Sequence, residues 1–133
     1  MKKAVVYWSG TGNTEAMAKA VAEGAGAPLI SAADFGAAQA AELDGIAFGC
    51  PAMGAEALEE SEFEPMFESV KGSLAGKRVA LFGSYGWGDG DWMQLWEDDC
   101  RAAGISLVCP SVICQGEPDA QTLAKCKALG AVL

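Results

Sequence analysis

Short runs of apolar residues alternate with stretches of helical periodicity along the whole chain. The apolar runs cover residues 4–8, 29–31, 46–49, 79–82 and 105–109, the last continued by 112–114. Their apolarity is continuous rather than alternating, which is typical of strands that helices bury on both faces. The pattern predicts alternating strands and helices around a parallel sheet, in which a ligand would bind at the carboxyl ends of the strands.

Helical patterns fill the intervals between these runs. We expect helices over residues 13–23, 35–43, 64–74, 92–103 and 119–129, of which 35–43 contains few large side chains. Glycine ends helices readily because it adopts the left-handed conformation without steric cost. Four of the five helices are expected to stop at a glycine: Gly24, Gly76, Gly104 and Gly130. Pro110 interrupts the last apolar run, and a proline is tolerated in a strand only at an edge or bulge, so this strand should form an edge of the sheet.

A loop of glycines and small polar residues, Ser-Gly-Thr-Gly-Asn-Thr at residues 9–14, joins the first strand to the first helix. The first N–H groups of a helix have no intrahelical partner, and with the neighbouring hydroxyls and amide they form a cup for a phosphate. The loop contains no Lys or Arg and has Asn13-Thr14 where a nucleoside triphosphate loop needs Lys and then Ser or Thr. A terminal monophosphate is therefore the better ligand, although an ordinary strand-to-helix turn uses the same residue types.

Two further loops, residues 50–56 and 83–90, follow the third and fourth strands. Each contains a large polarisable side chain, Met53 in one and Trp87 in the other. A slot between a thioether and an indole would accept a flat ring. The alternative for both side chains is packing within their own domain. We assign Trp8, at the end of the first apolar run, mainly to packing.

The composition restricts the class of partner. The chain has 133 residues, 51% of them hydrophobic, and a formal net charge of −9. This length fits one domain, and no segment is long enough for a membrane span. The acidity disfavours nucleic acid and anionic membranes as partners and favours a basic protein surface, although acidity also serves solubility.

Histidine is absent, and the five cysteines include no C-x-x-C pair. These absences argue against nucleophiles activated by histidine, the common metal sites and a disulfide framework. We therefore expect a reduced, cytoplasmic setting in which most thiols are small buried side chains.

Three segments, residues 7–15, 49–54 and 81–88, resemble the three FMN loops of the short-chain flavodoxins of anaerobic bacteria. The similarity covers nearly the whole chain as a single domain, residues 1–133, and the first and third segments are highly specific. It implies a flavodoxin-like α/β sandwich of three layers, with a five-stranded parallel sheet in the order 2-1-3-4-5 and helices on both faces. Two features depart from the family: the region 25–42 is short and rich in Ala and Gly, and Ala55 replaces a residue that is often polar.

The resemblance implies one noncovalent FMN. Its phosphate would lie in the 9–14 loop, and its ring between Met53 and Trp87, with the pyrimidine edge near Glu56. The peptide between Gly54 and Ala55 would turn over on reduction. The cofactor-binding residues implied by the resemblance are Ser9, Gly10, Thr11, Gly12, Asn13, Thr14, Pro51, Ala52, Met53, Gly54, Ala55, Glu56, Ser84, Tyr85, Gly86, Trp87, Gly88 and Asp89.

The function implied is that of a low-potential one-electron carrier cycling between neutral semiquinone and anionic hydroquinone FMN. It would be a monomer that docks electropositive redox proteins near the exposed flavin edge. A flavodoxin-like NAD(P)H:quinone reductase is the alternative, but it needs a second pocket and the chain has no second glycine fingerprint. A flavin-free receiver domain is disfavoured because the first strand lacks the paired acids that would hold Mg²⁺.

Overall fold

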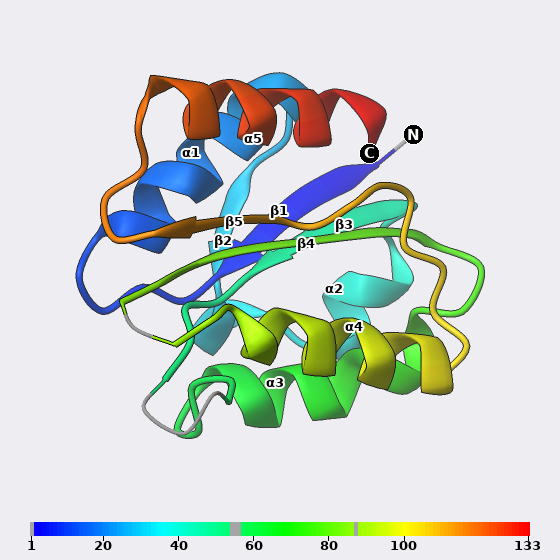
Figure 1. The fold of residues 1–133 in the computed structure, drawn as a ribbon. Coiled ribbons are helices and arrows are strands. Elements are labelled where there is room, and N and C mark those ends of the chain that lie inside the picture. The colour runs from blue at the N-terminus through cyan, green and yellow to red at the C-terminus, as the bar shows by residue number, and fades with distance from the viewer. Residues whose placement is uncertain (1, 54–56, 87) are drawn as a thin grey trace.

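A parallel five-stranded sheet forms the centre of the molecule, in a computed structural model that describes residues 2–53, 57–86 and 88–133 (Figure 1). The strands are β1 (Lys3–Tyr7), β2 (Leu29–Ser31), β3 (Gly45–Gly49), β4 (Arg78–Tyr85) and β5 (Val112–Gln115). Their spatial order is β2-β1-β3-β4-β5, and each neighbouring pair is parallel. The expected strand order is therefore confirmed.

Helices cover both faces of this sheet. They are α1 (Asn13–Ala25), α2 (Ala37–Ala41), α3 (Phe63–Val70), α4 (Asp91–Ala102) and α5 (Ala120–Val132), with 3₁₀ turns at Ala32–Asp34 and Lys71–Ser73. Figure 1 shows α1 and α5 on one face and α2, α3 and α4 on the other. The three-layer architecture is thus confirmed, although α2 is shorter than the expected 35–43 and α3 passes into a 3₁₀ turn after Val70.

The two faces of the sheet have separate cores. Phe48 of β3 packs edge-on against Phe67, with ring centroids 5.2 Å apart, and both belong to the core on the α3 and α4 face. On the opposite face, Val5, Phe82 and Met17 pack with the buried side of α5. Every residue of β3 is buried, which explains why this strand shows no alternation of apolar and polar residues.

Two glycines that were expected to end helices instead lie inside them. The helix α1 continues to Ala25, with Gly26 (φ 63°) as its C-cap, and α5 continues to Val132. A Cβ on Gly24 would lie 2.0 Å from the Lys127 carbonyl oxygen, and one on Gly130 would lie 2.1 Å from the Val21 carbonyl oxygen. The expected helix ends at 23 and 129 are therefore wrong, because these glycines permit close packing of α1 against α5.

The last strand is shorter than its apolar run. Of the two parts of that run, only the second forms β5, at the edge of the sheet as expected. Leu107 makes a single bridge to Val79, and the Val108 N–H donates to the Val79 carbonyl at 2.9 Å. Pro110 separates this bridge from β5, so the expectation of a strand over 105–109 is wrong. No helix among the described residues is long and apolar enough to cross a membrane.

Candidate cofactor site

The carboxyl ends of β1, β3 and β4 bring the three loops together. The Trp8 N–H donates to the Gly49 carbonyl at 3.0 Å, and the Ala52 N–H donates to the Ser84 carbonyl at 2.9 Å. A cavity of about 210 Å³ opens between the loops. It is lined by Trp8, Gly10, Thr11, Asn13, Pro51, Ala52, Met53, Ser84, Tyr85, Gly86 and Gly116.

The first loop presents neutral donors to this cavity. Gly12, with φ 96°, is the N-cap of α1 and has no side chain to cap the helix. The side chains of Thr11 and Asn13 line the cavity without a hydrogen-bond partner among the described residues. The positive end of the α1 dipole and these free donors suit an anion, which they can bind although the loop contains no lysine or arginine.

Ser9 and Thr14, at the two ends of the loop, make hydrogen bonds within the protein. Ser9 Oγ accepts from the N–H groups of Gly12 at 3.1 Å and Glu15 at 3.2 Å, so it shapes the loop from inside. Thr14 is buried, and its Oγ1 lies 2.9 Å from Ser84 Oγ. Ser9 retains one proton to donate, whereas the Thr14 hydroxyl is shared with Ser84; direct phosphate contacts by either remain predictions.

The second loop is closed at its base. The Met53 N–H donates to the Ala57 carbonyl at 2.9 Å, and the two residues form an antiparallel bridge. Met53 is 38% exposed and lines the cavity, as a ring-stacking residue requires. Gly54, Ala55 and Glu56, on which we placed a peptide turnover and the pyrimidine contact, lie outside the described residues.

A buried carboxylate anchors the end of the second loop. Glu59 Oε1 accepts from the N–H groups of Glu62 at 2.7 Å and Phe63 at 2.9 Å, while Oε2 accepts from the Ser61 N–H at 2.8 Å and from Ser61 Oγ. Burial alone would raise the pKa of Glu59, but these hydrogen bonds outweigh it and lower the pKa to about 2. Glu59 is therefore a permanent anion that caps the start of α3.

The third loop contributes mostly backbone. Tyr85 and Gly86 line the cavity, and Gln115 Nε2 donates to the Gly86 carbonyl at 3.2 Å. Gly88 has φ 86°, which favours glycine. Gly88 and Asp89 do not line the cavity, and Trp87 lies outside the described residues, so the stacking role expected of it stays a prediction.

Two lining residues were missed by the sequence reasoning. Gly116, with φ 71°, follows β5, and its N–H donates to the Tyr85 carbonyl at 2.7 Å. The rule that ligands bind at the carboxyl ends of strands applies to β5 as well and would have found it. Trp8, which we assigned mainly to packing, immediately precedes the glycine loop, and that position was the available signal.

Trp8 also lines a second cavity, of about 450 Å³, on the β2 side of the loop. Gly10 and Thr11 are the other residues that line both cavities. A Cβ on Gly10 would lie 3.1 Å from Cη2 of Trp8, and the indole Nε1 donates to Glu62 Oε1 at 3.3 Å. The indole and the loop thus form the partition between the two cavities.

Thiol and metal chemistry do not account for the site. Burial raises the pKa of Cys50, beside the second loop, to about 12, although a hydrogen bond from the Glu59 N–H opposes the rise. Such a thiol stays protonated and unreactive. Over residues 2–53, 57–86 and 88–133, no group of three or more potential metal ligands gathers.

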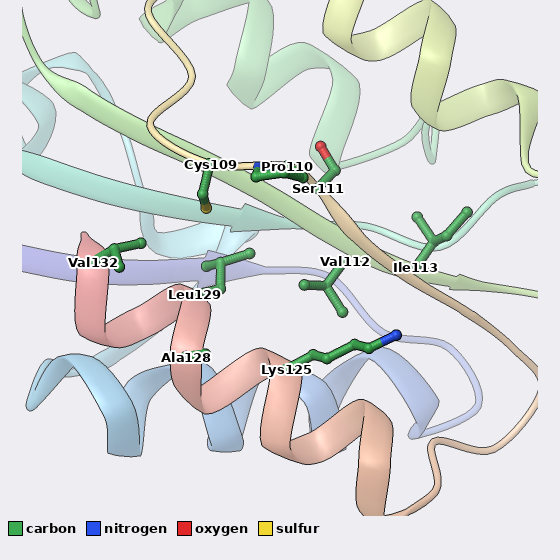
Figure 2. Close-up of a pocket in the computed structure, with 9 residues that line it drawn as sticks. All are labelled: Cys109, Pro110, Ser111, Val112, Ile113, Lys125, Ala128, Leu129 and Val132. Atoms are coloured by element: carbon green, nitrogen blue, oxygen red, sulfur yellow. The ribbon is translucent and has the colours of Figure 1, made fainter.

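The geometry fits FMN. Free neutral donors at the start of α1 suit its phosphate, and the exposed Met53, which lines the same cavity, suits its ring. A larger cavity of about 540 Å³ lies between β5 and α5, lined by Val112, Leu129 and seven other residues shown in Figure 2. None of the predicted cofactor residues lines it, so its size does not make it the cofactor site.

Comparisons with known proteins agree with this fit. The family model described as Flavodoxin matches residues 5–130. A flavodoxin of Clostridium beijerinckii is 48% identical over 120 residues, covering 86% of this chain and 87% of its own. A flavodoxin of Megasphaera elsdenii is 42% identical over 131 residues, covering 95% and 93%. The solution structure of two-electron reduced Megasphaera elsdenii flavodoxin superposes with a TM-score of 0.88, covering 98% of this chain and 96% of that one. The chain belongs to the flavodoxin family and to its short-chain type, whose members bind FMN and transfer electrons rather than act as enzymes.

Proposed function

We propose that this flavodoxin is a low-potential carrier that passes one electron at a time, its FMN alternating between neutral semiquinone and anionic hydroquinone. The observation that carries the proposal is the cavity at the ends of β1, β3 and β4, where Thr11 and Asn13 present free neutral donors and Met53 an exposed thioether. Bound FMN supplies the redox chemistry, and the protein supplies its binding site and electrostatic surroundings.

The side chains of Thr11 and Asn13, with the first N–H groups of α1, would hold the phosphate. The predicted residues of the second and third loops would then enclose the ring. Tyr85 and Gly86 line the wall on the β4 side, and Met53 lines the wall on the β3 side.

Fixed negative charge near the flavin ring would lower the reduction potential of the flavin by a limited amount. Glu59 is ionised over the whole working pH range because its pKa is about 2. At ~10 Å in a water-like dielectric, one carboxylate raises the energy of an added electron by about 0.4 kcal/mol, or roughly 20 mV. Several acids together would reach roughly 100 mV, so burial of the ring must contribute more.

The formal charge of −9 supports electropositive redox proteins as partners, docked near the flavin edge. We further propose a cytoplasmic monomer. The comparisons do not favour the quinone reductase alternative, and we expect no oxidation of NAD(P)H by the FMN-loaded protein in the presence of a quinone.

The test is a titration of apoprotein with FMN and with riboflavin, followed by spectroelectrochemistry. FMN should bind far more tightly than riboflavin, and Thr11→Val or Asn13→Ala should each weaken FMN binding by about 1.5 to 3 kcal/mol because a bond to a charged group is lost. Gln121→Ala, at an exposed position of α5 that does not line the cavity, is the control. Equal affinity for FMN and riboflavin would contradict the proposal, as would reduction without a semiquinone stage.

A further inference from the structure

Trp8 packs against the core on the α3 and α4 face, and its indole makes one described side-chain hydrogen bond. The indole Nε1–H donates to Glu62 Oε1 at 3.3 Å, across 54 positions of sequence. On its other side the indole contacts Gly10, where a Cβ would come within 3.1 Å of the ring. Glu62 therefore connects to the phosphate loop through a single side chain.

Glu62 itself is held in place by the second loop. The Glu62 N–H donates to Glu59 Oε1 at 2.7 Å, and Glu62 is the N-cap residue of α3. The Glu62 side chain makes no capping hydrogen bond to α3. Its hydrogen bond to Trp8 is the one contact described for that carboxylate, so changing the side chain leaves the helix start intact.

We propose that Glu62 is a positioning residue for the phosphate loop, acting through Trp8. The Glu59, Glu62 and Trp8 contacts link the end of the second loop to Gly10 of the first. A fixed indole keeps the partition between the two cavities in place, and with it the backbone conformation of residues 9–14. The inference rests on the proposed binding of the FMN phosphate in this loop.

If Glu62 acts through its charge alone, removing the side chain should tighten FMN binding, which is the opposite of what positioning predicts. A carboxylate lining the cavity behind the phosphate loop would repel a bound phosphate dianion, so its removal alone would tighten FMN binding. If Glu62 positions the loop, losing the acceptor for the Trp8 N–H, as in Glu62→Ala, weakens FMN binding. Glu62→Gln keeps an uncharged acceptor and does not weaken it. The sign of the change therefore separates the two roles.

The experiment compares five variants as apoproteins: Glu62→Ala, Glu62→Gln, Trp8→Phe, the double variant Glu62→Ala, Trp8→Phe and the control Glu64→Ala. Trp8→Phe keeps an aromatic ring but loses the donor. Glu64 is an exposed acid of the same helix with no described side-chain contact, so it matches the charge change alone. The dissociation constants for FMN and riboflavin and the melting temperature of each apoprotein are measured.

Glu62→Ala and Trp8→Phe should each raise the dissociation constant for FMN about two- to fivefold, with a smaller change for riboflavin. Glu62→Gln should bind FMN as tightly as the parent or more tightly, and the double variant Glu62→Ala, Trp8→Phe should be no weaker than the weaker single variant. The proposal is overturned if Glu62→Ala matches Glu64→Ala, if both Glu62 variants tighten FMN binding, or if only the melting temperature falls. Failure of the parent apoprotein to prefer FMN over riboflavin would instead overturn the proposed function.

Discussion

Thr14 Oγ1 and Ser84 Oγ lie 2.9 Å apart at the buried junction between the first turn of α1 and the end of β4. The two hydroxyls share one hydrogen bond, and both residues are buried. The pair therefore ties the phosphate loop to the third loop even when no ligand is bound.

Removing one partner of this pair should destabilise the apoprotein. Thr14→Val or Ser84→Ala leaves a buried hydroxyl without a hydrogen bond, which costs about 1 to 3 kcal/mol of unfolding free energy. The double variant should lose less than the sum of the two single variants, because it leaves no orphaned hydroxyl. Urea denaturation of the three apoproteins measures this; strictly additive losses would show that the hydroxyls are not paired.

Glu59 should make the protein sensitive to acid. Its pKa is about 2 in the folded protein against 4.5 for the free side chain, so its contribution is complete above about pH 4.5 and is lost as the pH falls toward 2. Glu59→Gln should lower the free energy of unfolding at pH 7 by up to about 3 kcal/mol and flatten its decline between pH 5 and 2. Denaturation curves across this pH range provide the measurement. Glu60→Gln, at an exposed neighbouring position, is the control.

The α1 and α5 glycines should tolerate no side chain. Gly24→Ala and Gly130→Ala would each place a methyl group against a backbone carbonyl that cannot move freely, with a cost of about 1 to 3 kcal/mol or more. Gly72→Ala is the matched control because a Cβ there meets nothing within 4 Å. Thermal unfolding should show a lower melting temperature for the first two variants and no loss for Gly72→Ala. An unchanged melting temperature for Gly24→Ala would show that the helices can separate at little cost.

The cysteines should fall into two groups of accessibility. Cys50, Cys100 and Cys126 are buried, whereas Cys109 and Cys114 are partly exposed. Burial also raises the pKa of Cys109 and Cys114, so their modification should be slow at pH 7 and faster at higher pH. Mass spectrometry after treatment with iodoacetamide should find label at Cys109 and Cys114 in the native protein and at all five cysteines after denaturation. Label on native Cys50 would contradict the burial described for it.

The fold was readable from the sequence where one physical requirement dominates. The buried run at 46–49 has to be a strand covered on both faces, and it lies within the fully buried β3. Pro110 requires an edge, and β5 is at the edge. The donor-rich loop after β1 suits an anion, and Thr11 and Asn13 of this loop line the cavity.

The sequence was ambiguous where two requirements ask for the same residue. A glycine serves equally to end a helix and to let another helix approach, and only the partner helix shows that Gly24 does the second. An aromatic residue at a strand end serves equally in packing and in a binding wall, which is why Trp8 was assigned to packing. Its bond to Glu62 depends on a contact between distant segments that no local pattern records.

The reciprocal packing of Gly24 against Lys127 and of Gly130 against Val21 has a consequence for folding kinetics. The first and last helices of the described chain meet backbone to backbone, so neither finds its place until nearly the whole chain has been brought together. Contacts of such long sequence separation require loop-closure entropy to be lost before any stabilisation is gained, and folding slows accordingly. The face of the sheet covered by α1 and α5 should therefore be completed late, after the central strands have already paired.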